Sequence, residues 1–166
     1  MNDSNRLCGQ FAVGIVSDTH GHVPSSVLEA FQGVDHVIHA GDIGSPQVLV
    51  ALSELAPVTA VRGNCDFGLW AQELPESAAV ELGPVLFLVA HIPTRADSLL
   101  KALRAAPRRV VVVSGHTHRP QIERQGELLF INPGTAGSSR CEWTHTVALA
   151  VVSQAGSVEA RLIKVD

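Results

Sequence analysis

The sequence predicts an α/β fold, because strand-like and helix-like segments alternate in its first half while short strands dominate its second half. Three apolar segments, at 11–16, 34–40 and 58–61, have the composition of buried strands. Helical segments that begin at Pro24 and Pro46 separate them, with apolar residues at helical spacing. A strand–helix–strand–helix–strand order implies parallel pairing through right-handed crossovers.

The second half shows a pattern of neighbouring strands. Segments 78–82 and 85–90 flank Gly83-Pro84, which is typical of a turn between antiparallel strands. A helix is predicted at 97–105 and a continuous apolar strand at 110–113. The remaining segments are predicted to form a run of antiparallel strands: 121–124, 128–132, 146–152 and 157–165.

Length and composition favour one globular unit. The 166 residues are 46% hydrophobic and 17% charged, and Gly and Pro are spread along the chain. We therefore expect a single domain over residues 1–166 with a loosely ordered N-terminus at 1–8. A formal net charge of -4 argues against a general nucleic-acid-binding surface, but a small phosphate-bearing substrate stays possible.

The chain has no signature of a membrane or secreted protein. No stretch approaches the roughly 20 continuous apolar residues that cross a bilayer, and the N-terminus lacks an apolar signal segment. Cys8, Cys65 and Cys141 have no paired spacing, so reduced thiols are expected rather than disulfides or a zinc knuckle. These features predict a cytoplasmic protein that does not bind membranes.

Polar residues follow several predicted strands at the point where each strand ends. Asp18 and His20 follow the first, Asp42 the second and Asn64 the third. In open α/β sheets ligands bind beyond the carboxyl ends of the strands. An extended backbone at Asp18-Thr19-His20 would direct the acid and the imidazole to the same side. A polar turn is the alternative for this motif taken by itself.

Later strand ends add imidazoles, and the full set contains oxygen and nitrogen donors but no thiolate. Such a mixture suits Mn, Fe, Ni, Co or Zn better than Ca or Mg. Seven donors exceed the needs of one ion, and two ions sharing a carboxylate would use them all. The seven residues are Asp18, His20, Asp42, Asn64, His91, His116 and His118.

The ordered series Asp-x-His, Gly-Asp, Gly-Asn, a lone His and Gly-His-Thr-His resembles the calcineurin-like metallophosphoesterases, over roughly residues 16–118. The short chain, Gly63-Asn64-Cys65-Asp66 and Asn132-Pro133-Gly134 are similar to the small phosphodiesterases of the YfcE type. The resemblance implies a sandwich of two mixed β-sheets flanked by helices.

The resemblance also implies roles for the seven donors. Asp18, His20 and His118 would hold one metal, Asn64, His91 and His116 would hold the other, and Asp42 would bridge them. The implied reaction is attack of a metal-bridging hydroxide on a phosphodiester, with Asp42, Asn64 and His91 as catalytic residues. Manganese is the expected ion, with Ni, Fe, Co or Zn as alternatives.

The sequence departs from the family pattern in two places. Cys65 stands where many relatives that cleave monoesters have a His that contacts the phosphate, which favours diesters or activated leaving groups. Ala90-His91-Ile92-Pro93 replaces the usual small residue after the lone His, so the loop shape is expected to differ. Cys65, His22 and Thr117 are candidate substrate-side residues, with packing, a solvated helix entry and loop bracing as their alternative roles.

Several polar or aromatic residues are interpreted as structural. His39 is expected in the core or behind the metal ligands, and His36 and His145 at the surface. Arg62 and Arg140 are expected in surface ion pairs, with a bidentate phosphate contact as the alternative. Asn132-Pro133-Gly134 is expected to organise a turn beneath the metal site, and Trp70 and Trp143 are expected to pack or to cover the entrance.

The function predicted is hydrolysis of a small phosphodiester or nucleotide-like substrate. A phosphomonoesterase with the same metals is one alternative. A protein-binding scaffold of this fold, or a module that binds metal and nucleotide without turnover, is another. A homodimer or a higher homo-oligomer is expected from the resemblance.

Overall fold

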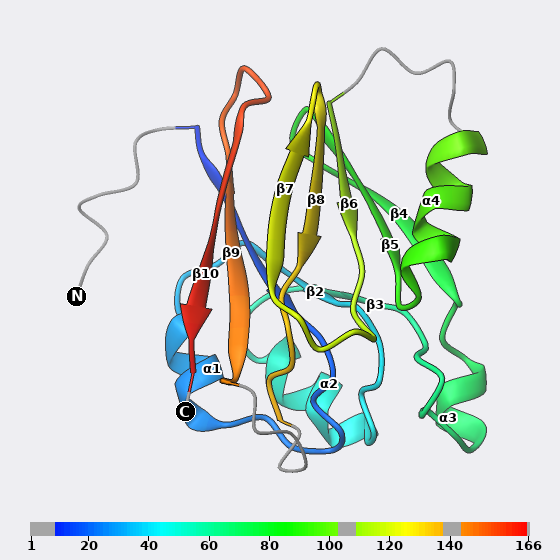
Figure 1. Cartoon of the computed structure of the whole chain (residues 1–166). Coiled ribbons are helices and arrows are strands. Elements are labelled where there is room, and N and C mark those ends of the chain that lie inside the picture. Colours follow the sequence, from blue (N-terminus) through cyan, green and yellow to red (C-terminus); the bar gives the residue numbers. More distant parts are fainter. Residues whose placement is uncertain (1–8, 103–108, 138–143, 166) are drawn as a thin grey trace.

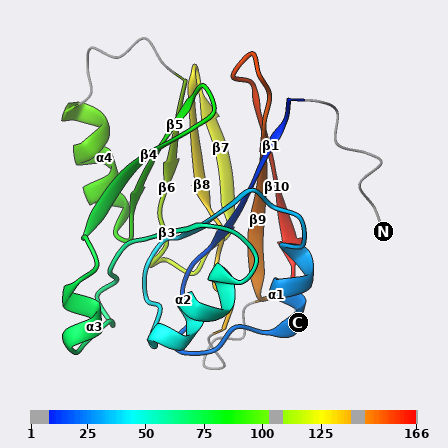
Figure 2. The ribbon, with the colours of Figure 1, turned by 180° about the vertical axis from the view of Figure 1, so that it is seen from behind.

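Two five-stranded β-sheets face one another in this computed structural model, which describes residues 9–102, 109–137 and 144–165. Figures 1 and 2 show the two sheets side by side with helices on their outer sides. The fold is α/β, with two mixed sheets flanked by helices, as expected.

The first sheet has the strand order β10-β9-β1-β2-β3. Its strands are β1 (Phe11–Val16), β2 (His36–His39), β3 (Val58–Ala60), β9 (Thr146–Val152) and β10 (Val158–Lys164). β1, β2 and β3 are parallel neighbours, whereas β9 runs antiparallel to β1 and to β10. The crossovers of the first half of the chain therefore form the parallel part of this sheet.

The second sheet has the order β4-β5-β6-β8-β7. Its strands are β4 (Ser77–Leu82), β5 (Val85–Ala90), β6 (Arg109–Val113), β7 (Gln121–Gln125) and β8 (Leu128–Asn132). β5, β6 and β8 are parallel, and β4 and β7 are antiparallel edge strands. β5 is buried at every position, which agrees with its place inside the sheet.

The main core lies between the sheets, where Ile15 and Ile38 of the first sheet belong to the same buried cluster as Phe87 and Ile131 of the second. On the outer face of the first sheet, α1 (Ser25–Ala30) and α2 (Pro46–Ser53) contribute to a second cluster. α4 (Pro93–Ala102) packs against β5 and β6 on the outer face of the second sheet. The result is a four-layer arrangement (Figure 1).

Local sequence explains where α2 begins. The side chain of Ser45 caps the helix by accepting a hydrogen bond from Gln47 N at 3.2 Å, and Pro46 occupies the first turn, where a missing N–H costs nothing. No comparable signal precedes α3 (Leu69–Gln72), which has four residues and follows Gly68 without a side-chain cap.

Two sequence predictions of the second half are wrong. The predicted run of antiparallel strands is two separate hairpins, β7–β8 and β9–β10, which lie in different sheets. Periodicity identified these strands but contains no information about which sheet each one joins. The helix predicted at 97–105 begins earlier, at Pro93, and its predicted end lies outside the described residues.

The N-terminal segment 1–8 also lies outside the described residues, as do Cys8, Arg140, Cys141 and Trp143. One domain over the whole chain stays a prediction. The parallel strands of both sheets end on the same side of the molecule, the lower side in Figure 1, and the loops that follow them carry the polar residues singled out above.

Candidate metal centre

The loops that follow β1 and β2 are hydrogen-bonded to one another through their backbones. Asp18 N donates to Gly41 O at 3.0 Å, and His20 N donates to Asp42 O at 3.0 Å. The parallel pairing of the two strands thus continues beyond the sheet. This pairing places the first two predicted ligands beside Asp42.

The second sheet is joined to the same loops. Gly115 N donates to His91 O at 3.0 Å, which links the ends of β5 and β6. Ala136 N donates to Ser17 O at 3.1 Å, and Thr135 Oγ1 donates to Asp18 O at 3.0 Å. Residues from four distant parts of the chain therefore meet at one end of the sandwich.

Backbone strain in the described part of the chain is concentrated at this end. Only five described non-glycine residues have a positive φ, and all five are predicted metal ligands: Asp18 at 55°, His20 at 47°, Asp42 at 53°, His116 at 68° and His118 at 56°. A left-handed conformation costs a non-glycine residue on the order of 1 kcal/mol. Strain that survives at such positions is typical of a functional site.

These angles overturn one expectation. The prediction that an extended backbone aligns Asp18 with His20 is wrong, because both residues are left-handed. Their side chains nevertheless converge, with His20 Nε2 4.0 Å from Asp18 Oδ1. The convergence comes from two left-handed turns and not from the alternation of a strand.

Asp18 is completely buried, and its two carboxylate oxygens have different surroundings. Oδ2 accepts hydrogen bonds from Ser17 Oγ at 2.6 Å and from His116 N at 3.2 Å. Oδ1 is buried and has no hydrogen-bond partner. Burial raises the pKa of Asp18, and the Ser17 hydroxyl and nearby imidazoles only partly oppose this effect. A buried carboxylate oxygen without a hydrogen bond is costly unless a nearby cation compensates its charge.

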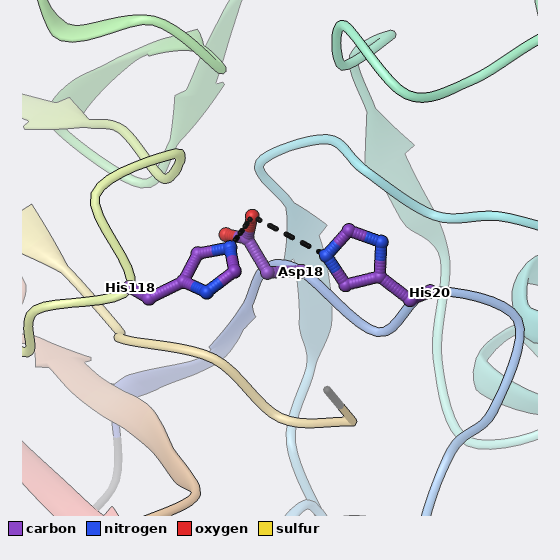
Figure 3. A group of neighbouring side chains, drawn as sticks. All are labelled: Asp18, His20 and His118. Carbon is purple, nitrogen blue, oxygen red and sulfur yellow. Dashed lines mark ion pairs between the residues drawn. The ribbon is translucent and has the colours of Figure 1, made fainter. Parts of the chain in front are cut away.

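Asp18 Oδ1 lies between two imidazoles, as Figure 3 shows. His118 Nε2 is 2.9 Å away on one side and His20 Nε2 is 4.0 Å away on the other. The ligand atoms of Asp18, His20 and His118 all lie within 4.8 Å of one another. This donor set matches the predicted ligands of the first metal.

A second group consists of Asp18, Asp42 and His91, whose ligand atoms also lie within 4.8 Å of one another. His91 Nδ1 is 2.8 Å from Ala40 O, so this nitrogen carries the proton, because a carbonyl oxygen can only accept. In the neutral ring the lone pair then lies on Nε2. That atom is buried without a hydrogen-bond partner and lies 3.4 Å from Asp42 Oδ1.

The two acids of the second group have opposite pKa shifts, because the pKa of Asp18 is raised and that of Asp42 is lowered. Burial alone would raise the pKa of Asp42, but the His91 imidazole and the N–H of Cys65, 2.8 Å from Oδ1, outweigh it and lower the pKa. For His91 the signs are reversed. Burial alone would lower its pKa, but Asp42 and Asp18 outweigh burial and raise it. Ionisation of Asp18 therefore opposes folding of the metal-free protein, whereas ionisation of Asp42 favours it.

The group membership differs from the predicted arrangement in one respect. Asp18 is the residue common to both groups, whereas Asp42, the predicted bridge, belongs only to the second. His116 packs edge-on against the His91 ring at a centroid distance of 5.2 Å. Asn64 is exposed, with Nδ2 3.4 Å from Cys65 Sγ. The bridging role of Asp42 and the ligand roles of Asn64 and His116 stay predictions.

Glycine precedes Asn64 for a steric reason. A Cβ at Gly63 would lie 2.0 Å from Asp42 Oδ1 and 2.1 Å from Asp42 N, closer than atoms can approach. Gly63 N also donates to Asp66 Oδ2 at 2.8 Å. The missing side chain therefore lets the loop after β3 pass directly against the Asp42 carboxylate.

Asp66 was not singled out from the sequence as a functional residue, although it holds two of the loops together. It is 5% exposed, and its second oxygen, Oδ1, accepts from Gly44 N at 2.7 Å. The carboxylate thereby ties the loop after β2 to the loop after β3. Its place inside the Gly-Asn-Cys-Asp motif was the available signal.

The three candidate substrate-side residues, Cys65, His22 and Thr117, are exposed. Burial and the Asp42 carboxylate raise the pKa of the Cys65 thiol. Thr117 Oγ1 accepts from Asn132 Nδ2 at 3.1 Å, and Asn132 Nδ2 also donates to Gly115 O at 2.9 Å. These contacts agree with the loop-bracing interpretation of Thr117 and with a turn beneath the site at Asn132.

The structural interpretations fare differently. Arg62 forms the expected exposed ion pair, with Glu76 at 2.8 Å. Trp70 is partly buried and packs against the cluster beneath the first sheet. The surface placement of His36 is wrong, because this residue is half-buried on β2 and its Nε2 contacts Thr59 Oγ1 at 2.8 Å. His145 is also only partly exposed.

His39 is fully buried, as expected for a core histidine, and its contacts require a neutral ring. Thr19 Oγ1 donates to Ile43 O, so His39 Nε2 donates to Thr19 Oγ1 at 2.9 Å. His39 Nδ1 accepts from Gly41 N at 3.2 Å. Burial lowers the pKa of His39 from 6.5 to about 3.

This histidine predicts a loss of stability in acid. Below pH 6.5 the unfolded chain binds a proton at His39 that the folded chain does not bind. Stability then decreases by up to about 1.4 kcal/mol per pH unit until the folded pKa is reached. We expect chelated wild-type protein to lose on the order of 1 kcal/mol more than His39→Gln between pH 6 and pH 5, measured by urea unfolding. Equal losses would contradict the assignment of a neutral buried ring.

None of the described helices is long and apolar enough to span a membrane. Residues 11–155 match the calcineurin-like phosphoesterase superfamily domain. The sequence is 33% identical over 169 residues to a probable metallophosphoesterase of Methanocaldococcus jannaschii, and the aligned region covers 96% of this chain and 84% of that protein. It is 32% identical over 149 residues to the phosphodiesterase YfcE of Escherichia coli K12, and this alignment covers 72% of this chain and 76% of YfcE.

Among solved structures, vacuolar protein sorting 29 of Cryptosporidium parvum superposes with a TM-score of 0.74. The superposition covers 95% of this chain and 100% of that protein. At 18% sequence identity, this likeness shows the fold alone. The match to the superfamily domain and the two relatives above 30% identity agree with the order of motifs along the chain and with the convergence of their acids and imidazoles. The chain belongs to the calcineurin-like phosphoesterase superfamily.

Proposed function

We propose that this chain is a phosphodiesterase that uses two divalent transition-metal ions. The observation that carries the proposal is that strained backbone coincides with buried ligand atoms that have no hydrogen bond. Five of the seven predicted ligands are left-handed, and Asp18 Oδ1 and His91 Nε2, which are buried without a hydrogen bond, belong to the same set. Folding free energy is spent here on holding anionic and imidazole donors together, which a cation would stabilise.

The donors present fit such ions. Asp18, His20 and His118 would hold the first, His91, Asn64 and His116 the second, and Asp42 would contact both. Mixed oxygen and imidazole donors favour manganese, with Ni, Fe, Co or Zn as alternatives. Two bound cations would lower the pKa of water and neutralise phosphate oxygens, so that hydrolysis needs no protein nucleophile.

The residues around the donors support a preference for diesters. The pKa of the Cys65 thiol is raised, so the thiol is neutral and a weak acid for protonating an alkoxide leaving group. Cys65 stands where monoester-cleaving relatives carry an imidazole. A substrate whose leaving group needs little protonation suits this site. His91 is held in one tautomer by Ala40 O, and Asp18 is held by Ser17 and His116 N.

The test is hydrolysis of bis(p-nitrophenyl) phosphate and p-nitrophenyl phosphate by chelated protein reloaded with Mn, Ni, Zn or Mg in turn. We expect metal-restored activity with kcat/KM higher for the diester. Higher kcat/KM for the monoester would instead assign a phosphomonoesterase with the same metals. No turnover with any ion, despite binding of two, would overturn the enzyme and favour a binding or scaffold role.

A further inference from the structure

A pocket of about 290 Å³ opens beside the candidate metal centre. Its lining residues include Asn64 and His91, two of the predicted metal ligands. Its other lining residues include Arg62, Phe67, Glu76 and Arg95, none of which has a role in holding metal. Its volume is close to that of small-molecule sites.

Two guanidinium groups converge on one carboxylate in this pocket. Arg62 Nη2 contacts Glu76 Oε1 at 2.8 Å, and Arg95 Nη1 contacts Glu76 Oε2. Hydrogen bonding from Arg62 and the charge of Arg95 lower the pKa of Glu76, which therefore carries a full negative charge. The trio has a net charge of about +1 at neutral pH. Glu76 thus holds two like charges together beside the same opening.

An aromatic ring lines the same pocket as these charges. Phe67 is 76% exposed, although a large apolar side chain gains free energy when it is buried. It follows Asp66, whose two backbone hydrogen bonds fix the preceding loop. Ile92 adds a second apolar side chain to the lining. The pocket therefore combines a planar apolar surface with paired guanidinium donors.

We propose that this pocket binds the second arm of the phosphodiester, and that this arm is nucleotide-like, with a planar ring against Phe67 and a further anionic group on Arg62 and Arg95. The proposal rests on the proposed function, because the scissile phosphate would lie at Asn64 and His91. A guanidinium presents several N–H donors in a planar fork, so a contact to Glu76 through one nitrogen leaves geometry suited to phosphate or carboxylate.

The test compares two probes that differ by one phosphate, thymidine 5′-phosphate and thymidine 3′,5′-bisphosphate, binding to Mn-loaded protein in a calorimeter. Wild type is expected to bind the bisphosphate about tenfold more tightly, and Arg95→Gln to reduce that ratio to about threefold or less. Arg109→Gln is the matched control, because Arg109 is also exposed and pairs with a glutamate, Glu127, at the start of β6. It should keep the wild-type ratio.

Phe67→Ala tests the ring. It is expected to weaken both thymidine ligands by about fivefold and to leave inorganic phosphate binding unchanged, because stacking on a base is lost. Equal binding of the two nucleotides by wild type, or a full preference kept in Arg95→Gln, would overturn the anionic contact. Unchanged nucleotide binding in Phe67→Ala would overturn the ring contact. Failure of the proposed function appears separately, as absent diester hydrolysis with every metal.

Discussion

Asp18→Asn is expected to lower metal-dependent diester hydrolysis by at least about a thousandfold, because it removes a ligand common to both candidate groups. The amide has nearly the shape of the acid, so its carbonyl oxygen can still accept from Ser17 Oγ and His116 N. The atom lost is the anionic Oδ1, which has no hydrogen-bond partner. Activity of purified, reloaded protein measures the effect.

The same variant should not be less stable than wild type when both are chelated. Burial raises the pKa of Asp18, so in the metal-free protein ionisation opposes folding, and stability falls as the pH rises through the folded pKa. Asparagine has no such ionisation. Urea unfolding at pH 7 with chelator checks this, with the exposed Glu123→Gln on β7 as control. An inactive variant that is also strongly destabilised would show that Asp18 is structural.

Asp42→Asn is expected to cause a similar loss of activity, at least about a thousandfold, because Asp42 is the proposed shared ligand. Its effect on the chelated protein should have the opposite sign. The pKa of Asp42 is lowered, so its charge contributes stability above the unfolded pKa, and that contribution is lost as the pH falls through the folded pKa. The variant should therefore be less stable than wild type at pH 7.

The two variants are expected to change the stability of the chelated protein in opposite directions at pH 7. Both carboxylates are buried next to imidazoles, yet Asp42 Oδ1 accepts an N–H from Cys65 at 2.8 Å while Asp18 Oδ1 accepts none. Stability at pH 7 and at pH 4 is measured for both variants by the same urea titration. Unchanged turnover in Asp42→Asn would contradict the two-metal scheme, and equal stability changes in the two variants would contradict the electrostatic account.

Much of the fold could be predicted because local signals and global structure agree. β5, β8 and β9 have the bounds predicted from apolar runs between turn residues. The parallel order of β1, β2 and β3 followed from the alternation of strands and helices. The assignment of β7–β8 and β9–β10 to different sheets could not be predicted, because it depends on long-range pairing with β6 and β1.

The candidate site shows the same division. Residue types at strand ends predicted which side chains meet, and Asp18, His20 and His118 do meet. The left-handed backbone that brings them together was missed. Histidine adopts a positive φ more often than most residues do, but the conformation is still uncommon, so the sequence does not show that His116 and His118 adopt it. A surface ion pair of Arg62 was expected, but its partner Glu76 and the second arginine, Arg95, could not be predicted, because the contact joins the segments after β3 and β5 only in three dimensions.

The most direct test of the two-metal centre is a calorimetric titration of chelated protein with Mn²⁺, in wild type, Asp18→Asn and Glu123→Gln. We predict about two ions per chain for wild type and Glu123→Gln and at most one for Asp18→Asn, because Asp18 is a proposed ligand of the first ion and also lies within the second donor group. Binding of two ions that Asp18→Asn leaves unchanged, or no binding by wild type, would contradict the metal centre.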